Sequence, residues 1–151
     1  MTIQKNSNLI PSVCKISVVP VSEVSYLGNT TDRFHKSIDF SGSIGWTGIY
    51  FTPGTAEFVE KPKDTDAGDL LEQSLKFIFP GEDDANVSAL DALVGPPVLV
   101  KIEYTTGAAK IMGDMVNGAK LSLTNQVASK GAGYQFEFTC SATYRACWLD
   151  A

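Results

Sequence analysis

Few residues in this chain have the type and spacing needed for catalysis. The only histidine, His35, lies in the strand-like stretch Phe34 to Phe40. One histidine cannot supply a two-histidine metal site, and no GxSxG nucleophile motif accompanies it to make a triad. The glycines from Gly42 to Gly48 form neither GxGxxG nor GxxxxGK[ST], the loops that hold phosphates. The residues therefore predict a protein that is not an enzyme and needs no cofactor.

The cysteines do not suggest metal or redox chemistry either. Cys14, Cys140 and Cys147 are an odd number and contain no CxxC pair. The first eight residues contain no apolar segment typical of an export signal, and no apolar run approaches the length of a membrane span. We therefore expect reduced thiols in a protein made in the cytoplasm, away from membranes. Cys140 lies on the apolar side of an alternating run, which predicts a buried thiol.

Acidic residues gather in two places, and they are candidates for binding a cation or for lining a negative surface. The members are Asp64, Asp66, Asp69, Glu82, Asp83 and Asp84. Their spacing does not follow the ligand positions of an EF-hand loop. We therefore expect no metal site, and we interpret residues 60–69 as a solvated loop and Glu82 to Asp84 as carboxylates at a helix N-terminus.

Aromatic side chains form the other candidate set. Trp46, Tyr50, Tyr104, Tyr144 and Trp148 are spread along strand-like segments. They could line a sugar-binding face. At strand spacing, aromatic residues are more often core or subunit-contact residues, and we expect this role for Trp148.

Period-two alternation predicts the elements that must position these residues. Leu71, Gln73, Leu75, Phe77 and Phe79 share one face of a strand, and similar runs recur with turn residues between them. One helix is expected at about residues 83–94, ended by Gly95 and two prolines. With 151 residues, 44% of them hydrophobic, the chain has the size and composition of one globular domain. We predict a mainly β fold, an antiparallel β-sandwich or barrel with one short α-helix, over residues 13–151.

Several short segments together show a resemblance to a known group of proteins. They are Phe51–Ala56, Asp66–Leu70, Leu75–Asp83, Gly95–Val98, Tyr104–Gly107, Lys110–Gly113, Gly133–Phe138 and Tyr144–Ala146. Over roughly the last two thirds of the chain, this pattern resembles small structural proteins of tailed phages and prophages, in particular phages of Bacteroidota-type hosts. Among such proteins, the tail tube family is the nearest fit.

The resemblance implies a virion protein assembled in the cytoplasm of a bacterial host. Tail tube proteins form hexameric rings that stack around a DNA channel and contact other tail or neck proteins. The net charge of −5 suits a wall past which DNA slides without specific binding. The acidic set and Trp148 are then candidates for channel lining or subunit contacts. We expect some of the acidic set, with Glu72, Glu103 and Glu137, to make the wall net negative.

Other functions fit the same residues. A head–tail connector, a tail-completion protein or a capsid decoration protein would also be small, β-rich and oligomeric. A secreted carbohydrate-binding β-sandwich module belongs to a different class and would normally carry an export signal.

Residues Met1 to Ser12 are polar and lack apolar periodicity, which predicts a flexible N-terminal arm that becomes ordered on a neighbouring subunit. Deleting these residues should leave the thermal melting of the domain nearly unchanged and should block assembly, as followed by calorimetry and electron microscopy. A truncated chain that assembles like the full chain would contradict this role.

Overall fold

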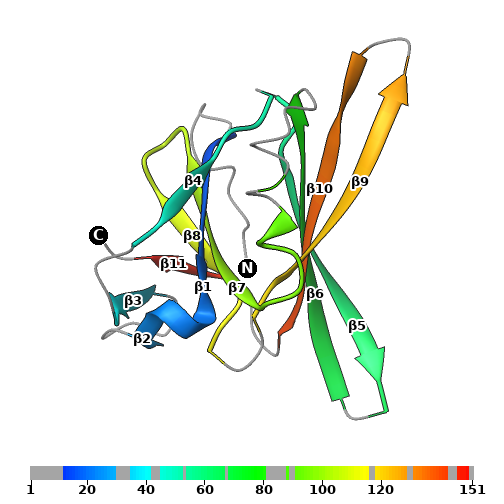
Figure 1. Cartoon of the computed structure of the whole chain (residues 1–151). Coiled ribbons are helices and arrows are strands. Elements are labelled where there is room, and N and C mark those ends of the chain that lie inside the picture. Colours follow the sequence, from blue (N-terminus) through cyan, green and yellow to red (C-terminus); the bar gives the residue numbers. More distant parts are fainter. Residues whose placement is uncertain are drawn as a thin grey trace.

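The computed structural model shows a mainly β fold of two stacked sheets, as in a β-sandwich (Figure 1). It describes residues 12–29, 35–41, 45–52, 54–66, 68–80, 88, 91–115, 118–128, 131–142 and 146–149. The arm predicted at residues 1–12 therefore lies outside the described residues, except for Ser12.

Seven strands form the larger sheet. Their spatial order is β2 (Val24–Asn29), β3 (His35–Phe40), β11 (Cys147–Leu149), β8 (Ala109–Met112), β7 (Val98–Tyr104), β1 (Val13–Pro20) and β4 (Thr47–Ile49). A short 3-10 helix, η1 (Val21–Glu23), connects β1 to β2. The smaller sheet has four strands in the order β5 (Glu57–Thr65), β6 (Gly68–Pro80), β10 (Gly131–Ala142) and β9 (Lys120–Ala128).

The main core lies between the two sheets and follows from the alternation of apolar residues in β6 and β10. Phe77 is paired with Phe136 and Leu75 with Phe138, and all four side chains are buried. The rings of Phe77 and Phe136 are 4.9 Å apart between centroids and meet edge to face, a favourable geometry for aromatic pairs. The predicted apolar faces of these two strands are thus confirmed.

The seven-stranded sheet is buried on both faces at its centre. In β1, Ile16 and Val18 enter the main core, whereas Val19 enters a second cluster with Leu99 of β7. Alternation along this strand would bury one face only. Ser17 and Val19 are buried as well, and Cys14 is exposed beside a register shift in the β1–β7 ladder. A strand covered on both faces cannot be recognised from alternation alone.

The seven-stranded sheet curves around the second cluster. The cluster members come from β1, β2, β7, β8 and β11, and side chains of β3 pack against them. Phe40 of β3 also packs edge-on against Trp46, just before β4, although β3 and β4 lie near opposite ends of the sheet order. The curved sheet therefore has a concave face of its own, separate from the main core.

Two local predictions were wrong. Residues 60–69 were expected to form a loop, but they form the end of β5, a short turn and the start of β6. This segment contains Pro62, and β5 is an edge strand, where proline is tolerated. The strands are not all antiparallel, because β11 pairs with β3 in parallel. No hairpin connects β3 to β11, so no tight turn sets their relative direction.

Most of the helix expected at residues 83–94 lies outside the described residues. Ser88 and Asp91 have helical conformation, and the Ala92 N–H donates a hydrogen bond to the Ser88 carbonyl at 3.3 Å. In the described part of the chain, no helix is long and apolar enough to cross a membrane.

Phe77 and Ile78 offer a direct test of the two-face assignment of β6. Phe77 is 1% exposed and Ile78 is 40% exposed. Phe77→Ala should lower the free energy of unfolding by about 3–5 kcal/mol, because it removes core contacts and leaves a cavity. Ile78→Ala, one residue further along, should cost far less. Chemical denaturation of both variants measures the difference, and equal losses would contradict the assignment.

Candidate functional site

The predicted acidic residues do not form one site in the described structure. Asp64 and Asp66 are exposed at the tip of the β5–β6 hairpin. Asp69 is described through its backbone alone, which pairs with Asp64. Glu82, Asp83 and Asp84 lie outside the described residues. Among the described residues, no group of three or more His, Cys, Asp or Glu side chains is arranged to hold a metal ion.

The outer face of the four-stranded sheet carries charges in a regular pattern. We call Glu57, Lys61, Glu72, Lys76, Lys120 and Glu137 the charged face. In one row across the sheet, Glu57 is paired with Lys76, and Lys76 with Glu137. In another row, Lys61 is paired with Glu72. Opposite charges on paired residues stabilise a sheet, by about 0.2–1 kcal/mol per pair.

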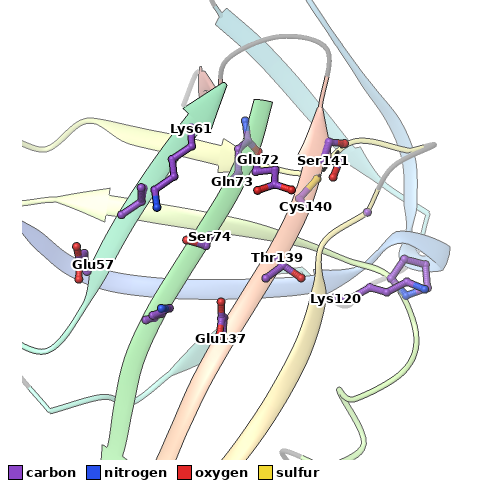
Figure 2. A pocket seen from close by; sticks show the side chains of 14 residues that line it. Glu57, Lys61, Glu72, Gln73, Ser74, Lys120, Glu137, Thr139, Cys140 and Ser141 are labelled. Atoms are coloured by element: carbon purple, nitrogen blue, oxygen red, sulfur yellow. Dashed lines mark hydrogen bonds between the residues drawn. The ribbon is translucent and has the colours of Figure 1, made fainter. Parts of the chain in front are cut away.

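The charged face lines a broad hollow of about 990 Å³. Figure 2 shows the side chains rising from β5, β6 and β10, with Lys120 contributed by β9. Ser74, Thr139 and Ser141 lie between the charged residues and add hydroxyl groups. Polar and charged side chains therefore make up most of the lining, with Val59 and Pro97 among the others, and the lysines and glutamates are equal in number.

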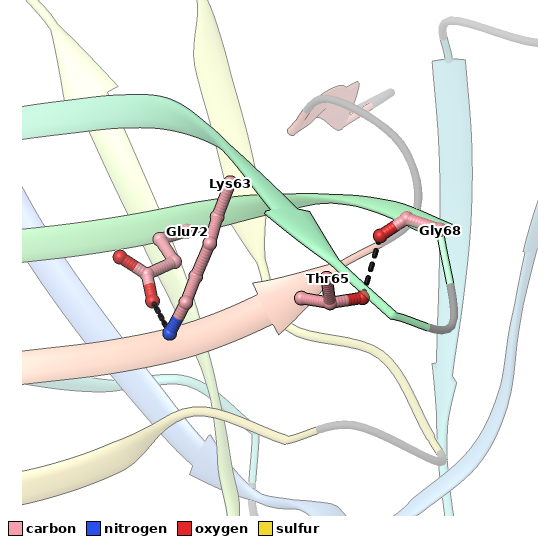
Figure 3. Close-up of polar contacts among 4 residues, drawn as sticks. All are labelled: Lys63, Thr65, Gly68 and Glu72. Carbon is pink, nitrogen blue, oxygen red and sulfur yellow. Dashed lines mark hydrogen bonds and ion pairs between the residues drawn. The ribbon is translucent and has the colours of Figure 1, made fainter.

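An ion pair and a hydrogen bond stabilise the tip of the β5–β6 hairpin (Figure 3). Lys63 Nζ lies 3.0 Å from Glu72 Oε1, and the Thr65 hydroxyl donates to the Gly68 carbonyl. Both charged side chains are about half exposed, so water weakens their attraction. Gly68 has φ of +121°, a conformation that favours glycine in this turn.

The carboxylates expected on a negative channel wall are divided between the two sheets. Glu72 and Glu137 lie on the charged face among lysines. Glu103 lies on the other sheet, where its Oε1 is 3.1 Å from Lys101 Nζ. The net negative wall stays a prediction for the assembled protein, but the charged face of one chain has as many lysines as glutamates.

The structure brings two of the predicted aromatic residues together. Trp46 and Trp148 line a second hollow, of about 730 Å³, with His35, Lys101 and Glu103. Tyr104 packs edge-on against Trp148. Tyr50 does not line this hollow and is 66% exposed. Tyr144 lies outside the described residues. Trp148 itself is half-buried and belongs to β11.

Each of these tryptophans has a lysine over its ring. Lys101 Nζ lies 5.3 Å from the ring centroid of Trp46, and Lys110 Nζ lies 4.9 Å from that of Trp148. Attraction between a cation and an aromatic face helps to hold such rings in place. Neither lysine stands out in the sequence, and Lys110 reaches Trp148 only through the pairing of β8 with β11.

Glu60 connects the two sheets beside Trp148. The Ala146 N–H, just before β11, donates to Glu60 Oε2 of β5 at 3.4 Å. Burial, and then the nearby Glu60 carboxylate, raise the pKa of Tyr104 above its ordinary value. Both effects favour the neutral phenol. Tyr104 therefore acts here as a packing partner of Trp148, with no sign of activation.

Two of the three cysteines are buried, which confirms the prediction for Cys140. Burial, and then the charge of Asp114, raise the pKa of the Cys140 thiol from 9.0 to about 11. Because the folded state binds this proton more tightly than the unfolded chain does, the thiol contributes to the free energy of unfolding, and the contribution is complete below about pH 9. That contribution is lost as the pH rises towards 11.

Alkylation with iodoacetamide at pH 8 should separate the cysteines. Cys14 is exposed and should react, whereas a pKa of about 11 leaves roughly one Cys140 thiol in a thousand ionised at that pH. Mass spectrometry of peptides over time measures each rate, with denatured protein as the control in which all three react. Equal rates for Cys14 and Cys140 in the folded protein would contradict the burial of Cys140.

Comparisons with protein-family models, with curated proteins and with solved structures found no match for this chain.

Proposed function

We propose that this chain is a virion structural protein, a tail tube subunit that assembles into stacked homo-oligomeric rings around a DNA channel. The observation that carries the proposal is the free edge of the four-stranded sheet at β9. Among the described strands, β9 pairs with β10 alone and runs for nine residues. A strand edge of this length that no described strand covers offers a row of backbone groups to a neighbouring chain.

The two edges of this sheet differ in a way that supports the proposal. The edge strand β5 contains Lys61, Pro62 and Lys63. Charged side chains and proline, which has no backbone N–H, commonly prevent another strand from pairing with an edge. After Lys120, β9 contains no charged residue and no proline. An edge without such protection is expected to be covered by a partner, and a second copy of the chain is the partner that a ring requires.

The charged face has properties that suit a wall facing DNA. Two of its lysines, Lys61 and Lys76, lie opposite glutamates in the sheet register, so their charge is compensated before a phosphate arrives. Lys120 lies opposite Thr139. Free lysines would each add a salt-dependent attraction to DNA. A polar, charge-balanced surface provides neither that attraction nor an apolar contact, so DNA would slide past without specific binding.

A connector, a tail-completion protein or a decoration protein would use the same fold differently. Electron microscopy of the purified protein distinguishes them, because tubes indicate a tail tube and single closed rings a connector. Monomers under every salt condition would favour a decoration or binding module and overturn the proposal.

Proline substitutions in β9 test the edge directly. The backbone N–H groups of successive residues in a strand point to opposite edges, and proline has no N–H. Of the two variants Thr124→Pro and Asn125→Pro, one therefore removes an N–H group that faces away from β10. That variant should lose assembly while its melting temperature stays close to that of the original chain. The other proline removes a bond to β10 and should destabilise the chain.

Thr124→Ala and Asn125→Ala are matched controls, because they change the same side chains and keep both N–H groups. They should assemble normally in electron microscopy and light scattering. If both proline variants fold and still form the same assemblies, β9 is not the contact edge.

A further inference from the structure

We propose that the hollow between Trp46 and Trp148, here called the tryptophan hollow, binds a neutral saccharide. It lies at the seven-stranded sheet and its volume is about 730 Å³. Small-molecule sites commonly have volumes of about 300–1,000 Å³ and combine apolar surfaces with a few polar groups. The residues that carry the proposal are Trp46, Trp148, Lys101 and Glu103.

The apolar part of the hollow suits the ring of a sugar. Trp46 precedes β4 and Trp148 belongs to β11, so two distant segments each supply an indole, and Ile38 of β3 adds an aliphatic surface. An indole presents a wide, rigid surface with little rotational freedom to lose on binding. The C–H groups on one side of a pyranose ring pack well on such a surface.

The polar part suits the hydroxyl groups of the same ligand. Lys101 Nζ and Glu103 Oε1 are 3.1 Å apart, and their side chains are 17% and 30% exposed. The ammonium group has three N–H donors and the carboxylate several acceptor positions, so both have capacity beyond their own ion pair. Lys101 could donate a hydrogen bond to one hydroxyl of a sugar, and Glu103 could accept one from the neighbouring hydroxyl.

The charge of the hollow favours a neutral ligand over an anion. Lys101 is already paired with Glu103, so an anionic group near this lysine would also meet the carboxylate. The lysines over the two indoles, and the Phe40 ring packed edge-on against Trp46, hold the aromatic surfaces before any ligand arrives. A site arranged in advance loses less free energy on binding.

This inference is independent of the proposed assembly. The tryptophan hollow belongs to the seven-stranded sheet, and the β9 edge belongs to the four-stranded sheet. Sugar binding is measurable on unassembled protein, and assembly is measurable without sugar. Failure of one experiment therefore leaves the other proposal intact.

The test is a titration of the whole protein with cellotetraose, mannotetraose, galactotetraose and chitotetraose, each to about 10 mM, the range of weak binding. Tryptophan fluorescence and calorimetry report binding, and we expect saturation with at least one of the four. Glu103→Gln keeps the shape of the side chain and should weaken that binding about tenfold, as for the loss of one hydrogen bond to a charged group. Glu72→Gln, in the exposed pair with Lys63, is the matched control and should bind normally.

Ala109→Phe provides a second variant, because Ala109 lines the hollow and is paired with Glu103. The larger side chain should fill the space and abolish binding, and the melting temperature of each variant shows whether it folds. The proposal is overturned if none of the four sugars saturates, or if Glu103→Gln binds as well as Glu72→Gln. Tighter binding of tetragalacturonate than of every neutral sugar would also overturn it.

Discussion

The phenylalanine rings of β6 and β10 pack together in the main core, and burying them fixes how these two strands pair. Phe77 lies opposite Phe136, and its ring also contacts those of Phe138 and Phe51. A slip of β10 by one residue against β6 would turn the rings of Phe136 and Phe138 to solvent and bury Glu137 instead. The register that buries the rings therefore also places the charged residues on the outer face. The core and the charged face result from one choice of register.

The second apolar cluster adds a surface that a flat sandwich would lack. Leu99 and Ile111 of the seven-stranded sheet are buried against Val19, Val24 and Cys147, on the face away from the main core. Covering this face draws β2, β3 and β11 around it, and Trp46 packs against the same cluster. The tryptophan hollow is thus a consequence of a sheet that is apolar on both sides.

The two proposed activities use different physical means on different sheets. Association through β9 relies on backbone hydrogen bonds, which any chain with a matching edge can supply, and shape then selects the partner. Recognition in the tryptophan hollow relies on two indoles and one ion pair held in place by neighbouring lysines. The charged face carries compensated charge, and its proposed role is to avoid binding.

The class of fold, and the apolar faces of strands that are buried on one side, can be read from the amino-acid sequence. Alternation in β6 and β10 identified Phe77 and Phe136 as core residues, and it predicted a buried Cys140, because a period of two is a local property of each strand. Alternation could not show that β1 is buried on both sides, that residues 60–69 form a hairpin, or that β3 pairs with β11 in parallel. It could not bring Trp46, Lys101 and Trp148 to one hollow. Those arrangements depend on pairing between strands far apart in the chain and on the curvature of the sheet, which no local pattern of residues encodes.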